Sequence, residues 1–257
     1  MRIAYIKTSA VLTTREMLRN RFAVTLLITI PALFFTIVWL TTGEHPVMFN
    51  LASVADNTVI EVSARNQSLV FIGVAAIGLI TSFLAMNLMQ KNSDVNRRLV
   101  LCGFHPSELV LAKLLVLFVV VFVVAFYLGA LLLVFFRPAH FLSLVLGFAL
   151  AGLVHSCYGL LVGSLVKREL EGILLIVLLV NIDAGWLQNP LYYAEAHNRA
   201  IIRFLPAYFP SQASIVSAFT DHSISGPLSG SIGYAATLLA VSILIYFRKM
   251  RIGGYKP

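Results

Sequence analysis

Few residues in the long apolar stretches of this sequence could take part in chemistry. His155, Ser156 and Ser164 fall in one apolar run, and Asp183 falls near the end of the next. A serine and a histidine could form a nucleophilic site, but no Gly-x-Ser-x-Gly elbow surrounds either serine. We therefore expect His155 to make a hydrogen bond between packed helices rather than to act as a base.

Sequence motifs for nucleotide and metal chemistry are missing as well. The sequence contains no Gly-Lys pair, and so no phosphate-binding loop, and it contains no HExxH zinc motif. The six histidines are scattered over loops and one apolar run, without the spacing of metal ligands. We expect no catalytic residue, no metal and no cofactor in this chain, so any energised work must draw on another subunit.

Asp183 is the one acidic residue deep in an apolar run, and Asn181 precedes it closely. An aspartate at the centre of a bilayer costs about 2.5–3.5 kcal/mol on insertion scales. Asp183 lies about 17 Å along its helix from the start of the run at residue 172. The carboxylate then faces a helix interface or a water-filled path, unless the run ends near Asn181 and leaves Asp183 among the outer headgroups.

The composition places these residues in a membrane. Of the 257 residues, 59% are hydrophobic and 12% are charged, and the mean hydropathy is +0.90. Soluble domains have roughly 45–50% apolar and about 25% charged residues. The sequence therefore predicts an all-α integral membrane protein, with residues 1–257 forming one transmembrane domain.

Six apolar runs are long enough to cross the ~30 Å hydrocarbon core as helices. They are residues 22–41, 69–89, 111–136, 141–166, 172–187 and 230–247. The fourth run is rich in small residues such as Gly147, Gly152 and Gly159, which predicts close helix packing. Residues 1–21 have an apolar arc of Ile3, Ile6, Ala10 and Met17, with Val11 and Leu18 at its edge, and we expect an amphipathic helix that lies in the membrane interface.

The basic residues predict the orientation of the chain. If all six runs span, fifteen of the 19 Lys and Arg residues lie on one side. The positive-inside rule then places both termini in the cytoplasm. We expect the protein to lie in a bacterial inner membrane. The net charge of +8 is explained by this asymmetry, and we expect the lipid bilayer and no nucleic acid as a partner.

The connection at residues 188–229, on the outer side, is too apolar for a free loop and too broken to span the membrane. Pro206 and Pro210 flank an aromatic stretch and should interrupt any helix, after which Ser211 could cap a short one. Broken backbone at membrane depth survives where protein surrounds it. We expect a re-entrant outer segment, made of a helix pair that dips into the outer leaflet.

A polar segment at residues 91–108 separates the second and third runs. Ser93 can cap a short helix, Gly103 can end it in a left-handed conformation, and Pro106 stops it before the next long helix begins. The segment therefore predicts a short helix, a sharp turn at Gly103 and then the start of the next long helix. It is either an ordinary cytoplasmic loop or a rigid lever that a soluble partner can push.

These features together resemble the membrane subunit of type-2 ATP-binding-cassette (ABC) exporters. The resemblance covers the whole chain. It rests on the span count, the basic N-terminal helix, the tight hairpin between the third and fourth spans, and two sequence motifs. The motifs are Arg97-Arg98-Leu99, Gly103, Pro106-Ser107-Glu108-Leu109 and Lys113 in the inner loop, and Pro206 to Pro210 in the outer segment.

The resemblance implies roles for particular residues. The loop at 91–108 would be a coupling helix seated in an ATPase subunit, with a second contact at the turn near Lys167. The implied coupling residues are Asp94, Arg97, Arg98, Leu99, Phe104, His105, Glu108, Lys167 and Glu169. The implied candidates for the substrate path are Phe71, Leu79, Phe83, Asn181 and Asp183. The outer lid would comprise Pro206, Tyr208, Phe209 and Pro210.

The function that the resemblance implies is that of a permease subunit of an ATP-driven exporter. It would move a hydrophobic or amphipathic substrate, such as a drug, antibiotic, peptide or lipid, out of the cytoplasm or inner leaflet. Its partners would be an ABC ATPase, which binds ATP and Mg²⁺, and a second permease copy or a paralogue. The alternatives are a lipid or glycan exporter, a non-exporting assembly or immunity component, and a membrane enzyme that uses His155 or Asp183.

Overall fold

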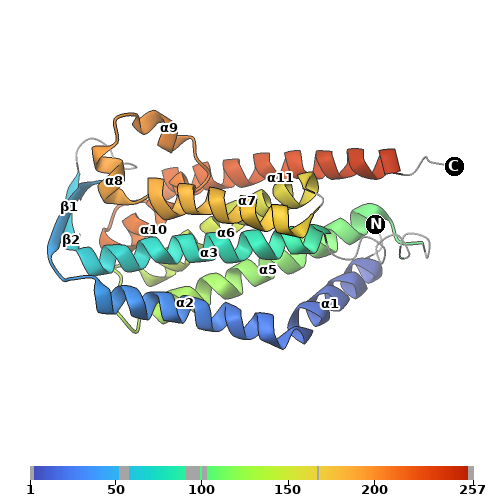
Figure 1. Cartoon of the computed structure of the whole chain (residues 1–257), viewed down its shortest axis with the longest axis horizontal. Helices are drawn as coiled ribbons and strands as arrows, with labels where there is room; N and C mark the ends of the chain where they lie inside the picture. Colours follow the sequence, from blue (N-terminus) through green and yellow to red (C-terminus); the bar gives the residue numbers. More distant parts are fainter. Residues whose placement is uncertain (1–2, 52–57, 91–98, 100–102, 167, 254–257) are drawn as a thin grey trace.

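Long apolar helices run side by side along one axis of the protein (Figure 1). The computed structural model describes residues 3–51, 58–90, 99, 103–166 and 168–253. The long helices are α2 (Arg21–Thr41), α3 (Ala64–Gln90), α5 (Pro106–Leu132), α6 (Phe141–Leu165), α7 (Glu169–Ile182) and α11 (Ser225–Gly253). With the π-helical turn η1 (Asp183–Leu187) that extends α7, they give six segments long and apolar enough to cross a membrane. The expectation of an all-α integral membrane protein is confirmed.

Shorter elements complete the two ends of the bundle. The N-terminal helix α1 (Ile3–Arg19) lies at the same end as the last turns of α11 (Figure 1). At the opposite end lie an antiparallel pair of strands, β1 (Pro46–Asn50) and β2 (Val59–Ser63), and the helices α8 (Pro190–Glu195) and α9 (Arg199–Arg203). The helix α10 (Tyr208–Phe219) packs beside α6 inside the bundle.

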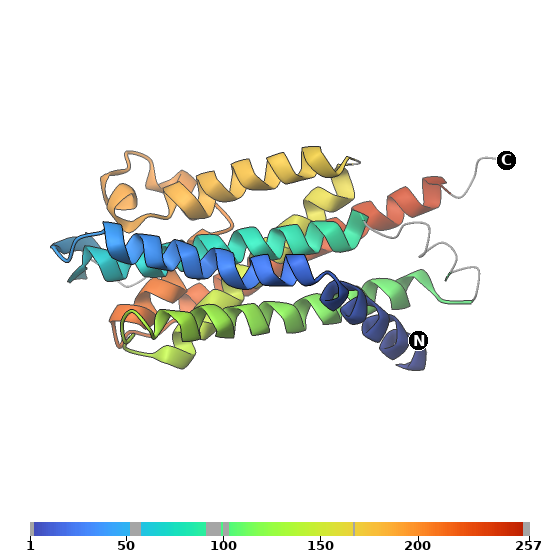
Figure 2. The same cartoon turned by 60° about the horizontal axis from the view of Figure 1, so that its bottom comes forward.

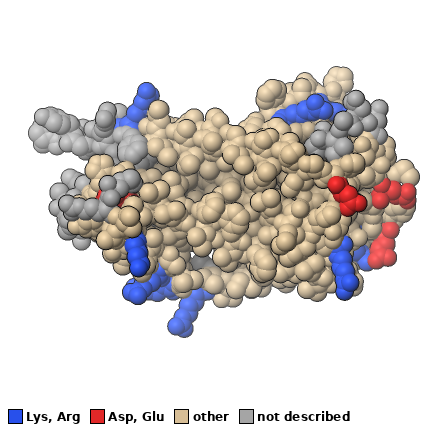
Figure 3. All heavy atoms as spheres, turned by 180° about the vertical axis from the view of Figure 1, so that it is seen from behind, with Lys and Arg blue, Asp and Glu red and all other residues tan. Residues whose placement is uncertain are grey.

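Charged side chains follow the same division. In Figure 3 the Lys, Arg, Asp and Glu residues of the visible face gather toward the two ends, with an uncharged band between them. Apolar helix surface of this kind can be covered by lipid, whereas ionised groups at the bilayer centre are costly. The distribution of charge therefore fits a chain whose long axis crosses the membrane.

Helix α6 is the centre of the bundle because three glycines let its neighbours approach. A Cβ atom at Gly159 would lie 2.2 Å from the backbone oxygen of Ser82 in α3. A Cβ at Gly147 would lie 2.9 Å from the backbone of Ser214 in α10, and one at Gly152 would meet a side chain of α5. The prediction that this run is a packing helix is confirmed.

Side chains from neighbouring helices hydrogen-bond to backbone carbonyls of this core. The Ser82 hydroxyl donates to the His155 carbonyl at 2.9 Å, which links α3 to α6. The Gln90 amide donates to the Val166 carbonyl at 3.1 Å, just beyond the end of α6. The Lys113 ammonium of α5 donates to the Leu88 carbonyl at 2.7 Å, in the last turn of α3. The bonds to Val166 and Leu88 satisfy acceptors that helix ends leave without a partner.

Helix α1 departs from the expected arrangement. It ends at Arg19, and Figure 2 shows it leaving the line of α2 to run along α5. The arc of Ile6, Ala10 and Met17, which we expected to face the membrane, is half-buried beside Ser9, which is buried. Packing against α5 covers only part of the arc, because Ile3, Val11 and Leu18 are exposed, and the interfacial position of α1 stays a prediction.

Two further expectations differ from the structure. Helix α5 ends at Leu132 rather than at 136. Arg137 precedes a proline and is therefore disfavoured in a helix, and the Phe136 ring stacks on Phe219. Pro210 and Ser211 lie inside α10, so the prediction that Pro210 breaks the helix and Ser211 caps it is wrong. A proline in the first helical turn costs no hydrogen bond, because that backbone position has no intrahelical acceptor.

The close contact at Gly159 gives a test of the packing. We expect Gly159→Ala to destabilise the protein by about 1–3 kcal/mol, because the added methyl group must displace the backbone of Ser82. Thermal unfolding of the purified full chain in detergent measures the effect. Gly233→Ala is the matched control, since nothing lies within 4 Å of a Cβ at Gly233 in α11. Equal melting temperatures for the two variants would contradict the packing described here.

Candidate functional site

Asp183 lies where α7 changes into the π-helical turn, and its side chain is 8% exposed. One carboxylate oxygen accepts a hydrogen bond from the backbone N–H of Ala207 at 2.9 Å. The other oxygen accepts one from the Gln188 amide at 3.2 Å. The carboxylate thus joins the end of α7 to the chain that leads into α10 and lies at a helix interface, and its depth in the membrane stays a prediction.

The Ala207 N–H belongs to the residue that precedes α10 as its N-cap. The first N–H groups of a helix lack intrahelical acceptors, and the helix dipole favours a negative charge there. Asp183 is 14 residues beyond the start of α7, which corresponds to about 21 Å along the helix axis. Asp183 therefore supplies, inside the protein, an acceptor that water supplies at the start of an exposed helix.

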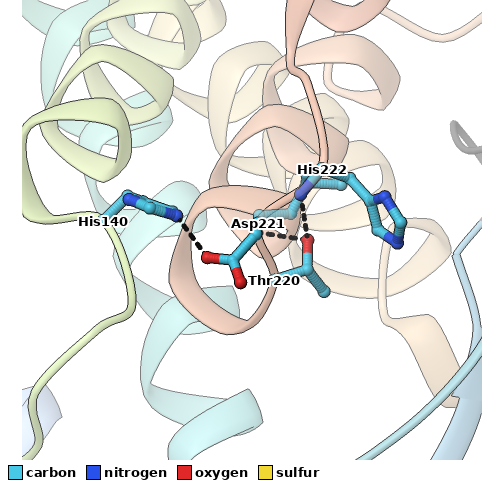
Figure 4. A network of polar contacts seen from close by, with 5 residues as sticks. His140, Thr220, Asp221 and His222 are labelled. Atoms are coloured by element: carbon cyan, nitrogen blue, oxygen red, sulfur yellow. Dashed lines mark hydrogen bonds and ion pairs between the residues drawn. The ribbon is translucent and has the colours of Figure 1, made fainter.

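The other end of α10 is held by the turn between α5 and α6. The backbone N–H groups of Ala139 and His140 donate to the carbonyls of Ala218 and Ser217 at 2.8 and 3.0 Å. Figure 4 shows the His140 ring directed toward Asp221, with 2.8 Å between the imidazole nitrogen and the carboxylate oxygen. In the same view the Thr220 hydroxyl accepts a hydrogen bond from the backbone of His222, whose ring points away. Both ends of α10 are thus fixed.

His155 lies buried at the crossing of α6 and α3. Its Nδ1 atom is 2.8 Å from the carbonyl of Ala151, and a Cβ at Gly78 would lie 3.1 Å from the ring. The ring also interacts electrostatically with Asp183. Its Nε2 atom is buried with no hydrogen-bond partner among the described residues. His155 thus lies at a helix interface, but the hydrogen bond of its ring stays within α6, and a ring hydrogen bond from His155 to another helix is not found among the described residues.

The lid candidates lie at the start of α10 within a cluster of aromatic rings. Tyr208 and Pro210 are buried, while Pro206 and Phe209 are half-buried. The Tyr208 ring is 6.0 Å from the ring of Tyr193, and its hydroxyl also takes part in hydrogen bonds with Tyr193 and Arg203. The lid role of the segment stays a prediction.

The path candidates separate into two groups. Leu79 and Phe83 of α3 pack against α7, near Ile176. Phe71 is half-buried and lies about two helical turns before Leu79 in α3. Asn181 is exposed on α7. The structure therefore brings Leu79 and Phe83 together at one helix interface but does not bring Asn181 to it.

The coupling candidates are described in part. Gly103 has φ +91°, as predicted for the left-handed end of a helix, and Phe104 packs edge-on against Tyr5 of α1 with the ring centroids 4.5 Å apart. Glu108 is 4% exposed, and its carboxylate accepts from the backbone of His105 at 3.1 Å in a capping box that opens α5. Leu99 is half-buried and Glu169 is exposed. Asp94, Arg97, Arg98 and Lys167 lie outside the described residues.

Sequence reasoning missed three partners in these contacts. Ala207 acts through its backbone N–H, which no residue type reveals, although Pro206 marks the nearby break in the chain. Gln188 follows the apolar run and carries no motif. Tyr5 lies outside the apolar arc of α1, and no motif in the sequence links its ring to Phe104.

In the part of the chain that the structure describes, six helices long and apolar enough to span a membrane surround a largely buried α10, which defines a multi-pass α-helical membrane protein. Residues 41–248 match the family described as ABC-2 family transporter protein. The chain belongs to this family and is a membrane permease subunit of an ABC-2 type transporter. A search of curated protein sequences found no match. Helix α1 and nearly all of α2 precede the matched range.

The bond between Asp183 and Ala207 predicts a local effect of mutation. We expect Asp183→Ala to loosen the start of α10, since a buried N–H left without an acceptor costs about 1–3 kcal/mol. Hydrogen exchange measured by mass spectrometry on the full chain should show ~5- to 100-fold faster exchange for peptides covering residues 204–212.

Asp221→Ala is the control for this experiment, because it also removes a carboxylate from an end of α10. Asp221 is almost fully exposed, and exposed ion pairs contribute about 0–1 kcal/mol. Its variant should leave exchange at residues 204–212 unchanged. Unchanged exchange in Asp183→Ala would instead show that the carboxylate does not hold α10.

Proposed function

We propose that this permease subunit belongs to an ATP-driven exporter, in which a separate ABC ATPase subunit pushes on the connection between α3 and α5. The observation that carries the proposal is that the described part of this connection makes contacts with both α1 and α5. Phe104 packs on α1, and His105 and Glu108 form the capping box of α5. A force applied here acts on two helices at once.

Lys113 extends this attachment to a third helix. Its ammonium bonds to the Leu88 carbonyl of α3 and also interacts electrostatically with Glu16 of α1. Helices α1, α3 and α5 are therefore held together at the end of the bundle that carries the connection. Packed helices move as rigid units, so a displacement of the connection would tilt them rather than bend them.

The proposed ATPase faces the end of the bundle that holds α1 and the last turns of α11. ATP and Mg²⁺ would be bound by the ATPase subunit. The positive-inside rule supports a cytoplasmic location for this end, because Lys and Arg residues predominate there if all six helices span. The site of ATP hydrolysis and the permease would then meet on the cytoplasmic side of a bacterial inner membrane.

The substrate class that we propose is hydrophobic or amphipathic, moved outward from the cytoplasm or the inner leaflet. The support is the apolar character of the α3 residues nearest to α7, Leu79 and Phe83. At the outer end the re-entrant α10, fixed by Asp183, would close the route. Drugs, antibiotics, peptides and lipids all fall within this class.

Association with the ATPase tests the proposal. Arg98→Glu should reduce co-purification of the cognate ATPase subunit by about tenfold or more, since it reverses a charge in the proposed contact. Arg137→Glu is the matched control, because it makes the same change in the exposed turn between α5 and α6 at the opposite end. Glu108 is unsuitable for this purpose, as its substitution would damage the capping box. Equal recovery of the ATPase with both variants would reject the coupling role.

The orientation can be tested by labelling single cysteines in intact cells. In a variant with Cys102→Ser, a cysteine introduced by Asn198→Cys should react with an impermeant maleimide added outside. A cysteine introduced by Thr14→Cys, on an exposed position of α1, should react only after the membrane is opened. The reverse pattern would place the proposed ATPase contact on the wrong side and overturn the proposal.

A further inference from the structure

Two titratable side chains, His155 and Asp183, are buried in the same part of the protein. His155 of α6 is 1% exposed, and Asp183, the first residue of η1, is 8% exposed. They interact electrostatically, although no hydrogen bond joins them directly among the described contacts. The protonation of each side chain therefore affects that of the other, away from bulk water.

The nitrogen of His155 that can gain or lose a proton is Nε2. The Nδ1 atom lies 2.8 Å from the Ala151 carbonyl, which can only accept a hydrogen bond, so Nδ1 carries a hydrogen. Nε2 is then a lone pair in the neutral ring and an N–H in the charged ring. It is buried, and no described residue gives it a hydrogen-bond partner. A change in the charge of His155 thus takes place at Nε2.

A third buried polar group lies beside the pair. Tyr158 follows His155 on α6 by three residues, and it packs against the cluster that contains Ala184 and Ala207. Its hydroxyl is buried, interacts electrostatically with Asp183, and has no hydrogen-bond partner in the described part of the chain. Buried waters typically make about three hydrogen bonds to polar groups of this kind. Nε2, the Tyr158 hydroxyl and the carboxylate together supply that number of partners.

Burial determines how many protons the pair holds. A lone charge inside a protein costs far more than a neutral group or a compensated pair of charges. With one proton the pair is neutral overall, whether that proton lies on Asp183 or on His155. With no proton or with two it has a net charge of minus one or plus one. In such a coupled pair the titration belongs to both residues jointly.

The elements around the pair offer no other ion that could compensate this charge, as far as the structure describes them. Helix α3 contacts the His155 ring through Gly78 and has no titratable side chain after Arg65. Arg203 of α9 is already hydrogen-bonded to two tyrosines. Cysteine and tyrosine ionise near pH 8.5 and 10 in water, so they are neutral at pH 7. The surrounding residues of these types are Cys157 and Tyr158 of α6, Tyr208 of α10 and Tyr234 of α11.

We propose that His155, Tyr158 and Asp183 form a buried proton-binding site, which holds one proton while Asp183 is bonded to the start of α10. The proton is shared between Nε2 and the carboxylate through a water that the Tyr158 hydroxyl also contacts. When the start of α10 opens, bulk water reaches both groups and accepts the proton. The site goes beyond the proposed export function, since it requires neither an ATPase nor a substrate.

The site links the opening of α10 to pH. In the open state the two groups have the ordinary pKa values of about 3.9 for aspartate and 6.5 for histidine. An open pair thus holds one proton between about pH 4 and 6.5 and none at higher pH. The closed pair keeps its proton, so closure takes up a proton only above about pH 6.5. There the closed state loses stability as the pH rises, by up to about tenfold per pH unit.

Hydrogen exchange of the peptides covering residues 204–212 in the full chain measures this opening. After correction for the chemical exchange rate, protection should be constant between about pH 5 and 6.5 and should fall roughly tenfold between about pH 7 and 8.5. Asp183→Asn keeps an oxygen that can accept from the Ala207 N–H but cannot bind the proton. Its protection should be constant above about pH 7 and fall below about pH 6.5, where water protonates His155 only in the open state.

His155→Gln tests the share of the histidine. The remaining carboxyl group keeps its proton when closed and loses it when open, so protection should already fall as the pH rises from about 5 to 6.5. His222→Gln is the matched control and should follow the wild type, because the His222 ring is exposed and points away from its neighbours (Figure 4). Melting temperatures monitor folding, and His155→Gln decides alone if Asp183→Asn does not fold. Protection in the wild type that is independent of pH, or one profile shared by the wild type and the folded variants, would overturn the proposal.

Discussion

A backbone N–H buried inside the protein must find an acceptor there, and the hydrogen bond from Ala207 to Asp183 meets this requirement at the start of α10. Without it the N–H would stay buried and unsatisfied, which costs about 1–3 kcal/mol. The same requirement explains why the apolar run of α7 retains an aspartate in spite of its insertion cost. The carboxylate is placed next to a helix N-terminus, where the charge is useful.

The same constraint governs the rest of the bundle. The hydroxyl of Tyr127 donates to the Ile28 carbonyl at 2.5 Å, three residues before Pro31 and thus beside the point where proline removes a helical hydrogen bond in α2. Ser82 and Lys113 donate to carbonyls of neighbouring helices in a similar way. Polar side chains in the spans are therefore directed at backbone groups, and the glycines of α6 bring those backbones within reach.

The sequence was sufficient to predict the features that depend on local composition. Hydropathy identified the six spans, Gly103 and Pro106 marked the break before α5, and the glycines of α6 predicted close packing. Contacts between distant segments were not predictable, because Ala207 has no side chain that signals its role. The strands at 46–50 and 59–63 lay within a segment that the composition showed only as polar. Prolines in the outer segment were misinterpreted, since a proline interrupts a helix in its interior but is tolerated in its first turn.

The contacts also determine how the proposed transporter could respond to a push. Helices α3 and α6 touch backbone to backbone at Gly159, and α6 and α10 do so at Gly147, so neither pair can slide without large clashes. Asp183 then adds the outer end of α7 to the same unit. A displacement at the inner connection would therefore reach the outer segment as a tilt of packed helices, over the full length of the bundle. Helix α2 buries little surface in this unit, whereas α11 packs along α6, where the Ser242 hydroxyl donates to the Cys157 carbonyl.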